Sequence, residues 1–175
     1  GSLLSPLNRQ FNTVAGSYIT EENTIYLLVE ENRLQEAVTE LIRIGLDHIA
    51  GFFTPEDLRS YAEQGGELAQ LQVSDFETIK AVKNDEDYAI LDVRKATEFK
   101  QAHLPKAYNI AHTRLAEHLQ ELPKNKTWLV HCQSGARSAV AAALLKRHGY
   151  NLIQIDDEFN PNISNDIEPS SSATY

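Results

Sequence analysis

The stretch TWLVHCQSGARSAVAAALLKRHGYNLIQI, residues 127–155, decides the fold of the second half of the chain. It opens with an apolar run at 127–131, passes through a short polar loop and becomes rich in alanine over 138–148. Gly149 stands where a helix of that length would end, and the apolar run 152–155 follows it. The order strand, loop, helix and strand predicts two parallel strands joined by a helix.

Short apolar runs and helically spaced apolar residues alternate in the same way outside the quoted stretch. The runs predict strands at 24–29, 47–53, 88–92 and 107–110. The helical spacing predicts helices at 30–45, 54–64, 73–82, 96–101 and 115–122, with Thr54 and Ser74 as N-caps of two of them. Short strands that alternate with helices are typical of a mainly parallel sheet with helices on both faces, so the predicted fold class is α/β.

The composition and charge of the chain narrow the class of protein. Its 175 residues are 42% apolar and 23% charged, which is ordinary for a globular domain in water. The net charge of −9 argues against nucleic acid and anionic membranes as partners, because phosphate binding needs an excess of Lys and Arg. No apolar run approaches the roughly 20 residues of a membrane-spanning helix. A single cysteine cannot form an intramolecular disulfide, so we expect a cytoplasmic protein.

From the two ends of the chain we expect it to be a piece excised from a longer protein. Residues 1–2 have the sequence Gly-Ser, which tag cleavage commonly leaves, and the chain contains no methionine. Residues 166–175 are rich in serine and poor in apolar side chains, which predicts a disordered tail.

Cys132 is the only cysteine, and two interpretations of it compete. A free cysteine is most often a small buried hydrophobe. Here it falls between a predicted parallel strand and a predicted helix that starts near Ser138, where ligands of α/β proteins bind. The helix N-terminus stabilises a thiolate, Gly135 lets backbone N–H groups converge on an anion, and Arg137 adds a fixed positive charge. These features together favour a nucleophile.

Two motifs in this part of the chain resemble those of the rhodanese family of sulfurtransferases. The sequence CQSGAR at 132–137 is similar to the active-site loop of that family. The family's second signature is similar to the upstream sequences LDVR at 91–94, EF at 98–99, HLP at 103–105 and AYNI at 107–110. The resemblance covers about 71–155. It implies a rhodanese-like three-layer sandwich, with a catalytic domain over 69–165.

The resemblance implies sulfur transfer through a persulfide on Cys132, without a cofactor. The donor would be thiosulfate or a thiol persulfide such as glutathione persulfide, and the acceptor would be cyanide, sulfite or a thiol. The loop expected to cradle the transferred sulfur comprises Gln133, Ser134, Gly135, Ala136, Arg137 and Ser138.

Charged residues near this loop are expected to support it. Arg137 either binds an anionic substrate or braces the loop against a carboxylate, and both alternatives stay open. Asp92 and Arg94 lie together at a predicted strand end, where we expect a buried ion pair rather than direct catalysis. Glu98 is expected to be the partner of one of the arginines.

The first third of the chain resembles a second, incomplete module of the same family. The sequences SPLNRQF at 5–11, VAG at 14–16, IGLD at 44–47 and AGF at 50–52 are similar to the inactive region of metallo-β-lactamase–rhodanese fusion proteins. This implies a partial, inactive region over 3–68 and a parent persulfide dioxygenase domain of metallo-β-lactamase fold as partner. A full module needs an earlier strand and helix that we expect the chain to lack. The expected result is an open sheet edge or a homodimer that shares strands.

Two other functions compete with a sulfurtransferase. Cysteine-dependent phosphatases and arsenate reductases have five residues between Cys and Arg, whereas this chain has four, so that chemistry is disfavoured. The second hypothesis is a non-catalytic adaptor that docks a partner protein. No metal is predicted, because the histidines do not lie at zinc-ligand spacing from one another, and His131 adjoins Cys132 too closely.

The chain departs from the family pattern at three places. Ala102 and Lys106 stand where the family usually has glycines, and the acidic sequence DDEFN at 156–160 replaces a glycine turn. We expect this acidic sequence to repel thiosulfate and sulfite, because like charges disfavour one another at close range. A persulfide or protein-bound donor is compatible with it.

Overall fold

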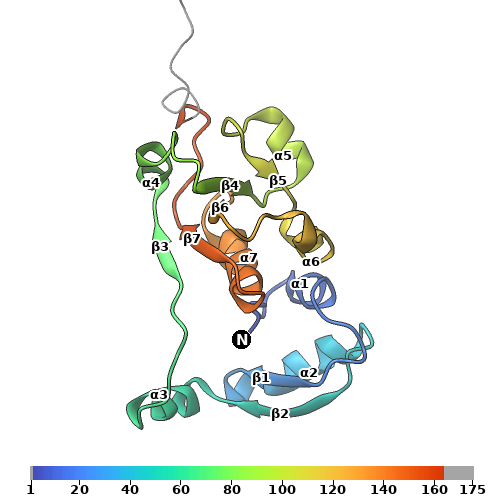
Figure 1. Ribbon diagram of the computed structural model, residues 1–175. Helices are drawn as coiled ribbons and strands as arrows, with labels where there is room; N and C mark the ends of the chain where they lie inside the picture. Colours follow the sequence, from blue (N-terminus) through green and yellow to red (C-terminus); the bar gives the residue numbers. More distant parts are fainter. Residues whose placement is uncertain (1, 164–175) are drawn as a thin grey trace, which may run out of the picture. The chain divides into compact units, whose positions relative to one another are not determined.

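The computed structural model describes residues 2–163 (Figure 1). It divides into two compact units. One comprises Ser5–Gln70, and the other comprises residues 2–4 together with the chain from Leu71 onward. Residue Gly1 of the predicted cleavage scar and the predicted tail at 166–175 lie outside the described residues.

The larger unit is built on a five-stranded parallel sheet (Figure 1). Its strands are β3 (Gln72–Ser74), β4 (Tyr88–Asp92), β5 (Tyr108–Asn109), β6 (Thr127–His131) and β7 (Asn151–Ile155). They lie in the order β3-β7-β6-β4-β5, and every neighbouring pair is parallel. The predicted α/β class is confirmed, and so are the predicted strands at 88–92 and 127–131.

Helices connect these strands. They are α4 (Phe76–Ala81), α5 (Ala96–Gln101), α6 (Leu115–His118) and α7 (Ala136–Arg147), with 3-10 turns η2 (His112–Arg114) and η3 (Leu119–Glu121) on either side of α6. The predicted helix 115–122 is therefore a short α-helix that continues as a 3-10 turn. Within residues 2–163, no helix combines the length and the apolar character needed to cross a membrane.

The two faces of the sheet are buried by different helices. On one face, Leu129 of β6 and Ile153 of β7 pack with Phe76 of α4 in one hydrophobic cluster. Because strand side chains alternate, Trp128 and Val130 point to the other face, where α7 contacts β6 and β7. Both side chains are fully buried. β6 thus lies in the interior of a three-layer arrangement, and its carboxyl end is held from both faces.

The predicted helix 73–82 is wrong at its start. Residues Gln72–Ser74 form β3, which pairs in parallel with β7 at the edge of the sheet, and the helix begins only at Phe76. Asp75, and not Ser74, caps the helix, because its carboxylate accepts two backbone N–H groups of the first turn at 3.1 and 3.4 Å. The expectation of a missing strand and helix concerns the first third of the chain, and the larger unit has its own first strand and helix in β3 and α4.

The smaller unit contains a two-stranded parallel sheet. Its elements are α1 (Phe11–Gly16), β1 (Ile25–Leu28), η1 (Glu31–Arg33), α2 (Leu34–Ile42), β2 (Ile49–Phe53) and α3 (Pro55–Glu63). Phe11, Ile25 and Leu41 lie in its core. The predicted N-cap Thr54 is confirmed. Its hydroxyl accepts the Asp57 N–H at 3.2 Å, and the Asp57 carboxylate accepts the Thr54 N–H at 2.8 Å.

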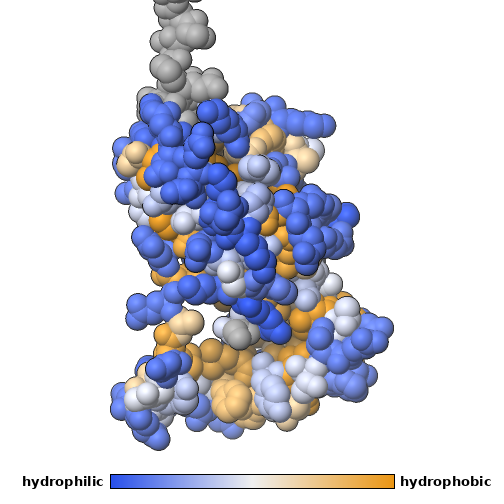
Figure 2. All heavy atoms as spheres, in the orientation of Figure 1, coloured by the Kyte–Doolittle hydropathy of each residue, from blue (hydrophilic) through white to orange (hydrophobic). Residues whose placement is uncertain are grey.

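One face of the β1–β2 sheet carries exposed apolar side chains, which we call the apolar face. It comprises Tyr26, Leu28 and Phe53, which are 63%, 55% and 54% exposed. Leu28 pairs in register with Phe53, and the rings of Tyr26 and Phe53 lie 6.3 Å apart. Figure 2 shows hydrophobic residues gathered over the part of the chain that contains this sheet. The core that contains Ile25 and Leu41 therefore does not bury the side chains of the apolar face.

Candidate functional site

Cys132 lies in the loop between β6 and α7. The loop ends at Gly135, because α7 begins two residues before the start predicted at 138. Arg137 and Ser138 therefore belong to the first turn of α7, and Cys132 is 1% exposed. The N–H groups of a first helical turn have no partner inside the helix and carry partial positive charge. This end of α7 can therefore stabilise an anion in the loop.

Ser138 connects the loop, the helix and the neighbouring strand. Its Oγ lies 2.8 Å from the carbonyl oxygen of Gly135 and 3.0 Å from that of Ile155. Cys132 Sγ lies 3.8 Å from the same Oγ. The hydroxyl can donate to a carbonyl oxygen while it accepts the thiol hydrogen of Cys132. The thiol is thus held against a fixed polar group in a buried position.

Gly135 is required by its backbone conformation and by its neighbour. Its φ is +84°, a left-handed conformation that L side chains rarely adopt. A Cβ built at this position would lie 1.7 Å from Asp156 Oδ1. The carboxylate of Asp156 therefore packs directly on the backbone of the Cys132 loop.

Residues 156–159 follow β7, and we call them the acidic segment. Its residue Glu158 forms an antiparallel bridge with Ser134 of the loop. Phe159 donates its N–H to the Gln133 carbonyl oxygen at 2.8 Å, and the Gln133 side chain donates Nε2–H to the Phe159 carbonyl at 3.0 Å. The remaining cradle residue, Ala136, is exposed at the start of α7. The acidic segment and the Cys132 loop therefore form one hydrogen-bonded structure.

Arg137 forms an ion pair with Glu98 of α5. Its Nη1 and Nη2 lie 2.7 and 2.9 Å from the two carboxylate oxygens, a bidentate arrangement. The hydrogen bonds from Arg137 lower the pKa of Glu98 to about 2, and those same bonds raise the pKa of Arg137. Of the two roles left open for Arg137, the structure contains the one in which it braces the loop against a carboxylate.

Asp92 and Arg94 form a separate ion pair at the end of β4. Both are buried, and Arg94 Nη2 lies 2.6 Å from Asp92 Oδ2. Arg94 also donates to the Ala102 carbonyl oxygen at 2.7 Å and lies 4.0 Å above the ring of Phe159. The charges of Asp92 and Arg94 are thus paired with each other, and the contacts of Arg94 join β4, the end of α5 and the acidic segment.

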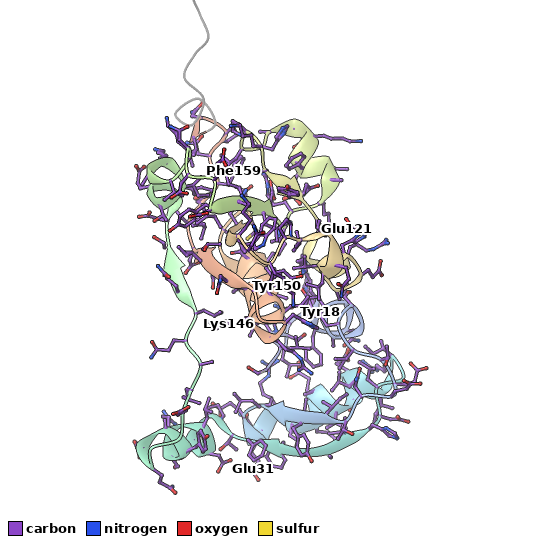
Figure 3. All side chains as sticks on the ribbon, viewed as in Figure 1. Tyr18, Glu31, Glu121, Lys146, Tyr150 and Phe159 are labelled. Carbon is purple, nitrogen blue, oxygen red and sulfur yellow. The ribbon has the colours of Figure 1, made fainter. Side chains whose placement is uncertain are left out.

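His131 and Phe159 are site residues that the sequence analysis did not identify. The His131 ring stacks on Phe159 with centroids 5.6 Å apart, and Nδ1 donates to the Cys132 carbonyl oxygen at 3.3 Å. Burial lowers the pKa of His131 to about 4, against the opposing effect of Asp92. Figure 3 labels Phe159, which lies in the same part of the unit as α4 and β4. Their contact joins residues 28 positions apart, so no local motif indicates it. The only sequence signal for either residue was its apolar neighbours.

The carboxyl ends of neighbouring strands bring these groups together. Asp92 ends β4, Cys132 follows β6 and Asp156 follows β7, and these three strands are adjacent in the sheet. Ligands of open parallel sheets bind at this edge. Among the described residues, no three His, Cys, Asp or Glu side chains group closely enough to hold a metal ion. The chemistry available at this edge comes from one thiol, the N-terminus of α7 and paired charges.

Part of the larger unit is similar to known proteins. Residues 75–159 match the family model described as Rhodanese-like domain. The putative sulfur carrier protein YrkF of Bacillus subtilis (strain 168) is 32% identical over 104 residues, which cover 56% of this chain and 56% of YrkF. A protein named sulfurtransferase from Allochromatium vinosum is 32% identical over 68 residues, which cover 39% of this chain and 64% of the relative.

A solved structure is also similar. The crystal structure of reduced Bacillus anthracis CoADR-RHD shares 26% sequence identity and a TM-score of 0.49, and the match covers 66% of this chain and 20% of that chain. In all three proteins the matched part spans less than two thirds of the other chain's length.

Proposed function

We propose that this chain is a sulfurtransferase that carries a sulfane sulfur as a persulfide on Cys132, because residues 75–159 match the family model described as Rhodanese-like domain. The observation that carries the proposal is the position of Cys132 between β6 and the N-terminus of α7. The thiolate is the nucleophile in this chemistry, and the partner-less N–H groups of the first turn of α7 can stabilise negative charge in the loop. The relatives named as a putative sulfur carrier protein and as a sulfurtransferase support the same chemistry.

The reaction has two half-reactions. In the first, the Cys132 thiolate attacks the outer sulfur of the donor, the donor's S–S bond breaks, and its electron pair leaves with sulfite or a thiolate. In the second, a nucleophilic acceptor attacks the outer sulfur of the Cys132 persulfide and regenerates the Cys132 thiolate. Cyanide becomes thiocyanate, sulfite becomes thiosulfate, and a thiol becomes a persulfide. The proposed donors are thiosulfate and thiol persulfides such as glutathione persulfide.

The surrounding residues have separate roles in this proposal. The backbone N–H groups from Gln133 to Ser138 stabilise the negative charge on the persulfide. The pair of Arg137 with Glu98 fixes the first turn of α7. The pair of Asp92 with Arg94 supports the strand end behind the loop. Only the Cys132 loop touches the reacting atoms.

The test is an intact-mass measurement after incubation with thiosulfate, and separately with glutathione persulfide. We expect a gain of about 32 Da, one sulfur atom, that cyanide removes and that the Cys132→Ser variant lacks. Retention of the added mass after cyanide treatment, or an equal gain in the variant, would contradict a persulfide on Cys132. No gain with either donor would refute the sulfurtransferase.

The smaller unit is a candidate docking module, and the apolar face favours this second function. Residues 5–70 contain 11 Asp or Glu, four Arg and no Lys, so the apolar face belongs to a strongly acidic unit. We propose that it binds a partner protein whose apolar patch has a basic rim, and the parent metallo-β-lactamase-fold domain is the candidate. Two acidic copies of this unit would repel each other, which disfavours a homodimer through this face.

The docking function is tested by titrating a separately produced persulfide dioxygenase domain into the chain and measuring heat of binding. Phe53→Ser, at a side chain that is 54% exposed, should weaken binding at least tenfold without unfolding the unit. Leu68→Ser provides a matched control, because Leu68 is 47% exposed and lies outside the apolar face. Equal weakening by both variants, or no binding by the unaltered chain, would refute this partner.

A further inference from the structure

The acidic segment places one carboxylate directly on the Cys132 loop. Asp156 Oδ1 occupies the space that a Cβ of Gly135 would need, 1.7 Å from that position. The backbone of Asp156 is held at the same time by β3, because its N–H donates to the Ser74 carbonyl oxygen at 2.9 Å. The carboxylate is therefore fixed beside the loop, and the residue is exposed to solvent.

The rest of the segment holds this position from the other side. Phe159 is 3% exposed and lies beneath Arg94 and against the rings of His131 and Phe76. Two hydrogen bonds join Phe159 to Gln133. Because both ends of the acidic segment are held in this way, Asp156 cannot leave the loop without breaking several contacts.

The other carboxylates of the segment are placed differently. Asp157 is turned toward α4, because its Oδ2 accepts the Phe76 N–H at 3.5 Å and its Oδ1 accepts the Glu158 N–H at 2.7 Å. Glu158 meets Ser134 through its backbone bridge, and its side chain is exposed. Asp156 is therefore the carboxylate of the segment that packs against the loop itself.

The two arginines of the site are paired with other carboxylates. Arg137 is neutralised by its bidentate pair with Glu98, and Arg94 is neutralised by Asp92. Within residues 2–163, no Lys or Arg side chain forms an ion pair with Asp156. Asp156 therefore places a negative charge, which has no ion-pair partner among the described residues, against the Cys132 loop, and this charge repels a donor that brings further negative charge to the loop.

We propose that Asp156 selects the sulfur donor by charge, so that the site takes donors with one negative charge, such as the persulfide anion of a thiol that is otherwise uncharged, in preference to the thiosulfate dianion. This inference rests on the proposed function. Repulsion by a single carboxylate scales with the charge of the donor. Removal of that carboxylate therefore lowers the free energy of the transition state twice as much for a dianionic donor as for a monoanionic donor.

Two donors of similar size separate charge from shape. Thiosulfate carries two negative charges, whereas methanethiosulfonate has a methyl group in place of one charged oxygen and carries one. We expect Asp156→Asn, which keeps the shape of the side chain, to raise kcat/KM about tenfold for thiosulfate and about threefold for methanethiosulfonate. The gain should shrink as salt is added, because salt screens exposed charges.

Glu86→Gln is the matched control. Glu86 is exposed in the turn before β4, at the opposite end of the sheet from Cys132, and the change removes the same single charge. This variant should leave the ratio of the two donors unchanged. An equal effect of Asp156→Asn on both donors, or the same shift in Glu86→Gln, overturns the selection by Asp156 while the sulfurtransferase stands. Failure of every donor to add sulfur to Cys132 in every variant overturns both.

Discussion

Replacing Gly135 with alanine tests how the Cys132 loop is held. Two costs are expected. The left-handed φ of +84° costs an alanine about 1 to 2 kcal/mol. The new Cβ would also lie 1.7 Å from Asp156 Oδ1, so the Asp156 side chain must rotate away, which costs about 1 kcal/mol more. The free energy of unfolding of the larger unit should therefore fall by about 2 to 3 kcal/mol.

The two costs can be separated because only the second depends on the carboxylate. In an Asp156→Ala background, Gly135→Ala should cost only the backbone part, about 1 to 2 kcal/mol. The difference between the two backgrounds is the coupling between the residues. Trp128 is the only tryptophan and is fully buried in β6, so its fluorescence during urea unfolding reports the larger unit alone.

Gly135→Ala should also change the sulfur-transfer activity. Gly135→Ala should abolish the addition of sulfur to Cys132, because the first N–H groups of α7 no longer point into the loop. A cost of Gly135→Ala that is equal in both backgrounds would show that the carboxylate does not press on Gly135. A cost below about 0.5 kcal/mol in both would refute the left-handed conformation as well.

Three further predictions concern the charged groups around the loop. Glu98 has a pKa lowered from 4.5 to about 2, so its pair with Arg137 stabilises the fold above pH 4.5 and is lost as the pH falls toward 2. Glu98→Gln should lack this acid-induced loss in the fluorescence assay, and an unchanged pH profile would refute the pair. His131 has a pKa lowered from 6.5 to about 4, so the unfolded chain takes up its proton first, and stability should fall as the pH drops from 6.5 to 4. Its NMR titration should have a midpoint near 4, and a midpoint at 6 or above would contradict its burial. Asp92→Asn leaves the Arg94 charge buried without its partner and should cost about 3 to 5 kcal/mol, whereas a cost below about 1 kcal/mol would show that water reaches Arg94.

Local signals explain which elements could be predicted from the sequence. The strand 88–92 and the helix 96–101 were predicted with their observed bounds, because polar turns border the first and a compact helical pattern defines the second. Residues 73 and 74 were misassigned to a helix, although they belong to β3. Their strand is three residues long and exists only because it pairs with β7, about 80 positions later.

The site shows the same division between local and distant information. The position of Cys132 followed from the strand before it and the helix after it, both within the quoted stretch. The sequence predicted Glu98 as the partner of one of the arginines, but its pairing with Arg137 depends on α5 reaching α7 across 39 positions. The contact of Asp156 with Gly135 depends on a three-dimensional turn after β7 that no local pattern encodes.

β3 also has a mechanical consequence. It is the first strand after the connection at Gln70–Leu71, it is three residues long, and it is held to the sheet by β7 alone. Its last residue, Ser74, holds the backbone of Asp156 through one hydrogen bond. Tension on the connection would therefore load that bond early, and its release would remove one of the contacts that hold Asp156 on the Cys132 loop. A force on the connection at Gln70–Leu71 is thus transmitted through β3 to Asp156, the residue that packs on the Cys132 loop.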